Sequence, residues 1–257
     1  MTDELRLTAI GGPTLLIEYR GLRLLTDPTF DPAGGDYPLG PVVLRKTTGP
    51  ALPLDALGPI DAILLTHDQH ADNLDRSGRE ALARAPRVLT TESGAARLGG
   101  SALGLVPWAT AYLPVPGGGL VAVTATPARH GPPGCEPVTG EVIGFVLAAS
   151  DGATGAAYLS GDTVWYEGVA EVARRFAVTT AVLFLGAARL REVGPAHLTM
   201  DAADAVEAAR AFGRALIVPT HFEGWAHFSE GRAEVDRAFA AAGLEHRLRW
   251  LTPGVPE

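Results

Sequence analysis

Cysteine is almost absent from this sequence: Cys135 is the only one among 257 residues, so no disulfide can form within a chain. Cations are scarce as well, since 21 Lys and Arg residues face 29 Asp and Glu residues and leave a formal charge of −8. Contacts to phosphates supply most of the affinity of nucleic-acid-binding proteins, so this balance argues against nucleic acid as a partner. We therefore expect a fold that does not depend on an oxidising compartment.

Long hydrophobic runs are missing too. No stretch reaches the roughly 18 apolar residues that are needed to cross a bilayer. The first residues include Asp3 and Glu4 and lack the apolar core of a signal peptide. We therefore expect a cytoplasmic protein with no membrane contact, and the sequence leaves open whether it forms a homo-oligomer.

What the chain does have is an apolar fraction of 47% and glycine and proline spread evenly along its length. No Gly/Ser-rich or Pro-rich linker divides it, so we expect a single domain over residues 1–257. Several β-like runs, later alternating with helical patterns, predict two sheets packed face to face with helices outside. Residues 28–50 carry five prolines and predict an irregular excursion, to which we assign substrate specificity as a hypothesis. Residues 248–252 predict a final strand.

The most informative stretch is residues 61–75. Residues 62–65 are uniformly apolar and predict a buried strand, and His67, His70 and Asp72 follow on the loop after it. Imidazole and carboxylate groups are ligands of Zn²⁺ and similar ions. Two histidines on a loop are more often solvated or hydrogen-bonded than bound to metal, so this pattern needs support from the rest of the chain.

That support comes from three further residues, because His130, Asp162 and His221 each follow another β-like run. Side chains at strand ends converge on one rim of a sheet. We predict one metal site and a second beside it, with Asp162 between them; the candidate ligands are His67, His70 and His130 for the first and Asp72 and His221 for the second. Such a pair of ions can yield metal-bound hydroxide at neutral pH, which attacks a carbonyl carbon or a phosphorus atom.

Five motifs in this order resemble the metallo-β-lactamase superfamily, and more narrowly the branch of L-ascorbate-6-phosphate lactonase and N-acyl-phosphatidylethanolamine phospholipase D. They lie at residues 10–18, 25–28, 160–163, 197–201 and 219–221. The resemblance implies an α/β (α+β) protein, a four-layer αββα sandwich with the metal cleft at one edge of the two sheets. It also implies one or two divalent ions, zinc first and manganese as the alternative, and a small-molecule ester, lactone or phosphoester as substrate.

The metal loop departs from the family pattern, which is His-x-His-x-Asp-His. Gln69 is an extra residue between the first two histidines, and Asn73 stands where the last histidine is expected. An asparagine offers only a neutral carbonyl oxygen, a poor ligand for Zn²⁺ and a better one for Mn²⁺ or Mg²⁺. We therefore expect one tightly held ion and a second that is weak or absent.

Other residues are assigned to catalysis and substrate binding by the same resemblance. Asp68 resembles a carboxylate next to the metal, although a surface aspartate fits the sequence equally well, and His197 resembles a substrate-contacting histidine or makes a contact at a helix start. Asp27 either supports a histidine or caps a turn. The catalytic candidates are Asp68, Asp162 and His197, and the substrate-binding candidates are His197, His227, Trp225 and Arg129, with loop packing as the alternative for His227 and Trp225 and a solvated or structural role for Arg129.

Three functions remain in view. The first is a metal-dependent hydrolase of a small ester, lactone or phosphoester. The second is a small-molecule phosphodiesterase or nuclease that uses the same site. The third takes Gln69 and Asn73 as signs of a decayed site and predicts a metal-poor, non-catalytic binding protein of the same fold.

Overall fold

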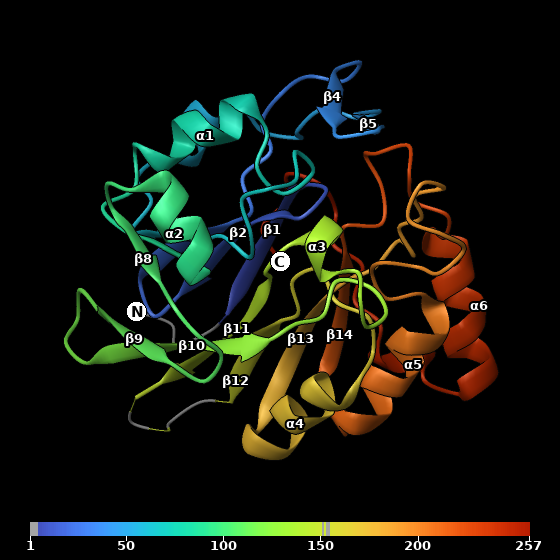
Figure 1. Ribbon diagram of the computed structural model, residues 1–257. Helices are drawn as coiled ribbons and strands as arrows, with labels where there is room; N and C mark the ends of the chain where they lie inside the picture. The colour runs from blue at the N-terminus through green and yellow to red at the C-terminus, as the bar shows by residue number, and fades with distance from the viewer. Residues whose placement is uncertain (1–4, 151, 153–154) are drawn as a thin grey trace.

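The computed structural model describes residues 5–150, 152 and 155–257, and its core is a pair of six-stranded sheets (Figure 1). The first sheet has the order β1-β2-β3-β6-β7-β8. Its strands are β1 (Arg6–Gly11), β2 (Thr14–Tyr19), β3 (Leu22–Thr26), β6 (Ala62–Leu64), β7 (Val88–Thr90) and β8 (Ala102–Gly104). The second sheet has the order β14-β13-β12-β11-β10-β9. Its strands are β9 (Thr110–Pro114), β10 (Leu120–Pro127), β11 (Ile143–Ala149), β12 (Ala156–Leu159), β13 (Val178–Phe184) and β14 (Leu216–Thr220).

Helices cover the outer faces of both sheets, so the predicted αββα sandwich is confirmed. Figure 1 shows α1 and α2 beyond the first sheet and α4, α5 and α6 beyond the second. The helices are α1 (Arg76–Leu82), α2 (Glu92–Leu98), the single turn α3 (Glu136–Thr139), α4 (Glu167–Arg175), α5 (Ala202–Ala211) and α6 (Arg232–Ala242), with 3₁₀ turns η1 (Leu54–Leu57) and η2 (Glu245–Arg247). Among the described residues, no helix has the length and apolar character to span a membrane.

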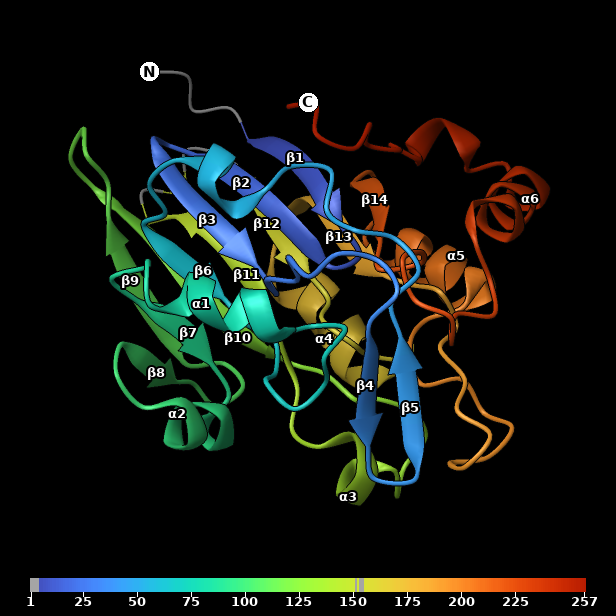
Figure 2. The same cartoon turned by 90° about the horizontal axis from the view of Figure 1, so that it is seen from above.

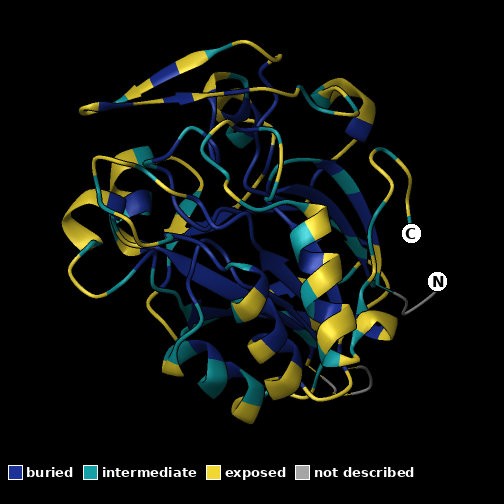
Figure 3. Cartoon of the chain, turned by 90° about the vertical axis from the view of Figure 1, so that its right-hand side faces the viewer, coloured by how far each residue is buried: buried dark blue, intermediate teal, exposed yellow. Residues whose placement is uncertain are grey.

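Three hydrophobic clusters fill the spaces between these four layers. On β2, Leu15 and Ile17 face the cluster between the two sheets, whereas Leu16 faces the cluster beneath α1. Successive side chains of a strand point to opposite faces, so a strand covered on both faces must be apolar throughout. The third cluster joins the second sheet to its helices, with Tyr158 packed against Phe212. Figure 3 shows the buried sheets inside and the exposed helix faces outside.

The sheet topology brings several strand ends to one edge. Strands β12, β13 and β14 are parallel, and β10 runs in the same direction as β12 because both are antiparallel to β11. In the first sheet β3 and β6 are parallel. The loops after β10, β12 and β14, with those after β3 and β6, therefore carry the residues that form the site described below.

Residues 28–50 are more regular than the sequence predicts. They contain a two-stranded hairpin, β4 (Asp36–Leu39) and β5 (Val42–Arg45), that belongs to neither large sheet. Figure 2 shows the hairpin projecting beyond the ends of the sheets. Its base is fixed by Lys46, whose Nζ donates to Asp75 Oδ2 at 2.8 Å and to the carbonyl of Thr29 at 3.1 Å. Both partners of this ion pair are buried.

Two further differences concern weakly patterned segments. Strands β8 and β9 lie on either side of Trp108, in a stretch whose sequence has no clear strand pattern. The strand predicted over residues 248–252 is wrong: Leu248 makes one isolated bridge to Ile217, and the segment continues as coil. Leu248 and Trp250 pack against the helical cluster of the second sheet, with Trp250 against Phe222, and Leu251 packs against the cluster between the two sheets, so burial there does not require a strand.

Candidate metal centre

Three histidine rings converge at the edge where the strands end. His67 and His70 lie on the loop after β6 and His130 lies on the loop after β10, and all three are buried. His70 Nδ1 lies 3.0 Å from His67 Nε2 and 3.3 Å from His130 Nε2. The extra residue Gln69 does not prevent this convergence, because its side chain packs against Gly140, where an added Cβ would lie 2.1 Å from Gln69 Nε2.

Hydrogen bonds behind two of these rings decide which nitrogen faces the site. His130 Nδ1 lies 2.8 Å from the carbonyl of Leu198, which only accepts, so Nδ1 carries the proton. Thr66 Oγ1 donates to Asp27 Oδ1 at 2.9 Å and therefore accepts from His67 Nδ1, 3.0 Å away. In the neutral rings, His67 Nε2 and His130 Nε2 consequently present lone pairs to the site.

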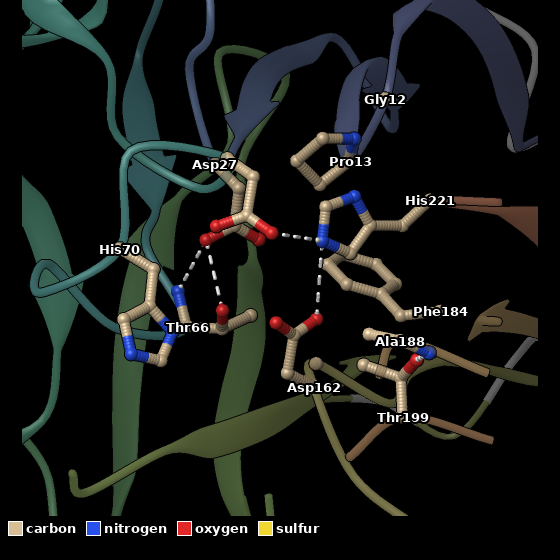
Figure 4. Close-up of polar contacts among 12 residues, drawn as sticks. Gly12, Pro13, Asp27, Thr66, His70, Asp162, Phe184, Ala188, Thr199 and His221 are labelled. Carbon is tan, nitrogen blue, oxygen red and sulfur yellow. Dashed lines mark hydrogen bonds and ion pairs between the residues drawn. The ribbon is translucent and has the colours of Figure 1, made fainter. Parts of the chain in front are cut away.

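A second group of ligand atoms adjoins the first through Asp162. Asp162 Oδ2 lies 3.5 Å from His130 Nε2 and 3.9 Å from His67 Nε2, and Oδ1 lies 3.4 Å from His221 Nε2. Asp72 Oδ2 lies 3.6 Å from the same nitrogen of His221. Figure 4 shows the Asp162 carboxylate and the His221 ring turned toward one another. Asp162 is thus shared by two clusters: His67, His70, His130 and Asp162, and Asp72, Asp162 and His221.

Asp27 and His221 both have unusual backbones, with φ of 28° and 53° directly after β3 and β14. Non-glycine residues in this left-handed region carry strain that the surroundings must offset. The backbone N–H of His221 donates to the carbonyl of Gly12 at 3.1 Å, and Asp27 Oδ1 accepts from Thr66 N at 2.8 Å. This backbone conformation directs both side chains into the interior, where they are fully buried.

The protonation states in this centre suit cation binding. Burial, together with the neighbouring histidines, holds the pKa of His67 well below its usual value and lowers that of His70 to about 4. Burial alone would raise the pKa of Asp72 and Asp162, but the histidines around them outweigh it and keep both pKa values low. Neutral imidazoles and ionised carboxylates are the forms that coordinate metal ions.

His221 differs, because the two carboxylates beside it outweigh burial and raise its pKa to about 10. Its Nδ1 and Nε2 are buried without a hydrogen bond within the described chain, as are Asp72 Oδ1 and Asp162 Oδ1. Buried polar atoms are rarely left without partners in native proteins. His221 Nε2 faces Asp72 and Asp162, where a divalent cation fits the chemistry of the cluster, whereas His221 Nδ1 lies on the other side of the ring, toward Gly12.

His227 brings another imidazole to this group from the loop after His221. Its Nε2 lies 3.0 Å from Asp72 Oδ2, and its side chain is 9% exposed. Asn73, by contrast, is fully buried, and within the described residues neither atom of its amide has a hydrogen-bond partner. The carboxylate next to Asn73 therefore has two histidine neighbours, His221 and His227, although the loop itself lacks its last histidine.

A narrow pocket opens onto the two clusters. It is open to solvent, and His70, Asp72, His130 and His227 line its inner end. The hairpin, α3 and the segment around residues 188–198 supply the walls. The excursion at residues 28–50 thus contributes to the pocket through Leu39 and Leu44.

Two of the catalytic candidates are engaged elsewhere. The buried Asp68 carboxylate binds Arg97, with 2.9 Å between Asp68 Oδ2 and Arg97 Nε. His197 lies 3.2 Å from Asp204 Oδ2 and 3.6 Å from Asp201 Oδ2 at the start of α5. Neither lines the pocket, and neither belongs to the two clusters around Asp162. Asp68 is instead held to α2 through Arg97, and His197 is held to the start of α5 through Asp201 and Asp204.

The remaining substrate-binding candidates lie in different places, and only one of them lines this pocket. Trp225 is buried beneath the hairpin, where its ring lies 5.2 Å from that of Tyr37. Arg129 stacks on Tyr166 at 4.4 Å and lines a different, more open pocket that shares only His130 with the first. Of the four candidates, His227 alone lines the pocket above the clusters.

Sequence reasoning missed the groups that hold and surround the ligands. Thr66 directly precedes His67, and a hydroxyl next to a candidate ligand is a usable signal, although a weak one. The carbonyl of Leu198 gives no signal, because any residue has one. The pocket residues Leu39, Val138 and Leu190 look like ordinary apolar positions until the fold brings them together.

Comparison with solved structures agrees with this architecture. The isothiocyanate hydrolase from Delia radicum gut bacteria is 24% identical, with a TM-score of 0.82 and 98% of both chains covered. A protein of Veillonella parvula described as a possible metal-dependent hydrolase is 19% identical, with a TM-score of 0.81 and 98% of both chains covered. The metallo hydrolase Igni18 from Ignicoccus hospitalis is 21% identical, with a TM-score of 0.70, and the match covers 98% of this chain and 97% of that one.

These likenesses establish the fold, and the family follows from the sequence itself. Residues 22–222 match the model of the beta-lactamase superfamily domain, which is more than half of the chain. The matched region runs from β3 to the residue after His221 and so contains every member of both ligand clusters. The chain therefore belongs to the beta-lactamase superfamily.

Proposed function

We propose that this protein is a metal-dependent hydrolase of small molecules with an ester or lactone carbonyl. The observation that carries the proposal is the shared position of Asp162 between three inward-facing histidines and a second group made by Asp72 and His221. Divalent ions held there, zinc first and manganese as the alternative, would supply Lewis-acid chemistry by polarising the carbonyl and acidifying water. The pocket gives a small substrate access to this place.

The proposed role of each residue follows from its position in the centre. His67 and His130 present lone pairs because Thr66 and the Leu198 carbonyl hold their other nitrogens. Asp162 keeps the two clusters at a fixed separation. His227 restrains the Asp72 carboxylate and lies at the inner end of the pocket, where it can contact a substrate.

The decisive experiment measures metal content and turnover on the same preparations. Protein purified without added metal or chelator is analysed by inductively coupled plasma mass spectrometry. It is then tested on p-nitrophenyl esters, simple lactones, an aryl isothiocyanate and bis-p-nitrophenyl phosphate. We expect one to two ions per chain and turnover of carbonyl substrates.

Matched variants distinguish the site from the scaffold. Asp162→Ala removes the shared carboxylate and should lower both metal content and kcat/KM, the latter by about a hundredfold or more. Asp55→Ala removes an aspartate whose side chain is 83% exposed, and it should change neither. Turnover of the phosphodiester alone would replace this proposal with a phosphodiesterase. Absence of metal, even after zinc or manganese is offered, would favour the non-catalytic binding protein.

A further inference from the structure

The walls of the pocket above the ligand clusters are almost entirely apolar. Six aliphatic side chains from three separate segments form them: Leu39, Leu44, Val138, Ala188, Leu190 and Leu198. Among the residues that the structure describes, the only other wall residue is Thr139, and the remaining lining residues are the histidines and Asp72 at the inner end. The part of a substrate that extends away from the reacting centre must therefore lie against hydrocarbon.

No lysine or arginine is among the described residues that line this pocket. Arg191, next to the wall residue Leu190, is exposed and does not line the pocket, and three other nearby cations have partners elsewhere. Lys46 is buried against Asp75, the exposed Arg189 donates to the carbonyl of Pro195, and Arg129 stacks on Tyr166 in the other pocket. The net charge of −8 also disfavours the approach of anions.

We propose that the substrate is a small molecule whose distal part is uncharged and apolar, such as a short-chain acyl ester, and that molecules with a carboxylate or phosphate in that part are rejected. The inference deepens the proposed hydrolase function and rests on it. Its physical basis is desolvation: a charge that moves from water into a pocket without a counter-ion pays a penalty that no contact there offsets. A methyl group at the same place gains from burial.

The test uses two esters that differ at one end. In 4-nitrophenyl butyrate the acyl chain ends in a methyl group, and in 4-nitrophenyl hemisuccinate it ends in a carboxylate at nearly the same length. We expect kcat/KM to favour the butyrate by at least about tenfold, mainly through KM. Equal values, or a preference for the hemisuccinate, would overturn the inference while leaving the hydrolase intact.

A positive charge placed in the wall should weaken or abolish this preference for the butyrate. Leu190 is partly exposed, so Leu190→Arg adds a counter-ion with little risk to the core. In this variant the ratio of the two kcat/KM values should fall by about tenfold or more, whereas Leu190→Gln should lower it less. Val43→Arg is the control: Val43 is 55% exposed on the hairpin and does not line the pocket, so its ratio should stay that of the wild type. The same change in Val43→Arg would mean that the long-range attraction between the added arginine and the anionic ester, and not the pocket wall, sets the preference.

Binding separates failure of this inference from failure of the hydrolase proposal. Butyranilide and succinanilic acid are the corresponding uncleaved pair, and their dissociation constants can be measured by calorimetry on the metal-loaded protein. Tighter binding of butyranilide in the wild type, lost in Leu190→Arg, supports the apolar pocket even if neither ester is cleaved. Tighter binding of the anion would refute it.

Discussion

Thr66 sets the orientation of His67, a candidate metal ligand. Its hydroxyl lies between Asp27 Oδ1, at 2.9 Å, and His67 Nδ1, at 3.0 Å. Groups behind a metal ligand commonly contribute 10- to 100-fold to metal affinity. We expect Thr66→Val, which keeps the shape and removes the hydroxyl, to weaken binding of the first ion by about that factor.

The matched variant Thr66→Ser retains the hydroxyl and should keep near wild-type affinity. Competition with a chromophoric chelator measures both dissociation constants. If Val and Ser at this position gave the same affinity, the hydroxyl would have no part in positioning His67.

His227 offers a second prediction at the same scale. Its Nε2 restrains Asp72 Oδ2 from 3.0 Å, so His227→Ala should loosen the Asp72–His221 group and leave the three-histidine cluster intact. We expect the second ion to dissociate about tenfold or more readily, while the first is unchanged. Stepwise titration of metal-free protein with zinc reports both affinities, and His246→Ala, an exposed position, is the control. Equal loss of both ions would contradict this division.

Most of the candidate ligands could be predicted from sequence because each is a His or Asp within three residues of the end of a strand, a pattern that strand geometry turns into proximity. His67, His130 and Asp162 are brought together as that pattern predicts. His197 and Asp68 show its limit. Their motif positions are typical of the family, but their hydrogen bonds are decided by Asp204 and Arg97, which lie 7 and 29 residues away.

Among the elements, the hairpin β4–β5 depends on buried carboxylates at its base. Asp31 accepts from Tyr37 Oη and Ser77 Oγ, both at 2.6 Å, and from the backbone of Arg76 and Ser77. Burial alone would raise the pKa of Asp31, but these donors outweigh it and lower the pKa. The ionised form is therefore favoured by folding.

The contribution of Asp31 to the stability of the fold depends on pH. A carboxyl with a depressed pKa stabilises the fold at pH values above its unfolded pKa near 4, and that contribution is lost as the pH falls through the lower folded pKa. We expect Asp31→Asn to reduce the free energy of unfolding by about 1 to 3 kcal/mol at pH 7. The difference from wild type should shrink below about pH 4.

Urea unfolding at several pH values tests this expectation. Asp36→Asn is the control, because Asp36 is an exposed residue of the same hairpin that pairs with Arg45 on the surface, where ion pairs contribute little. A constant difference between wild type and Asp31→Asn from pH 7 to pH 3 would show that the charge of Asp31 is not what matters.

Helix α2 and strand β2 were predictable from signals in the sequence: Thr91 caps α2, Gly99 marks its end, and β2 lies between the turns at Gly12-Pro13 and Arg20-Gly21. The hairpin was not, because Pro38 lies inside β4 and prolines interrupt the patterns that identify strands. At residues 248–252 the sequence predicts a strand that the structure does not contain. There Leu248 and Trp250 pack against the helical cluster of the second sheet and Leu251 packs between the two sheets, without forming a ladder of hydrogen bonds.

At the scale of the whole molecule, the candidate centre joins the two sheets. His67, His70 and Asp72 follow β6 of the first sheet, and His130, Asp162 and His221 follow strands of the second. Ions that bind the folded chain and not the unfolded one stabilise it, by about 4 kcal/mol at a concentration of a thousand times Kd. We expect removal of metal with EDTA to lower Tm by about 10 °C.

Calorimetry of metal-loaded and chelated protein measures this shift, and Asp162→Ala should show much less of it. Restoring zinc to the chelated wild type should restore Tm. An unchanged Tm after verified removal of metal would mean that the two sheets hold together without help from the centre.

The pocket has a further consequence for how this protein can change. Its aliphatic walls come from the hairpin, α3 and the segment at residues 188–198, whereas the ligand side chains come from the ends of strands. Library mutagenesis of Leu39, Val138 and Leu190 can therefore explore new specificities without altering any metal ligand. The reactive centre and the choice of molecule are evolvable separately, and a hairpin grafted from a relative should carry its preference with it.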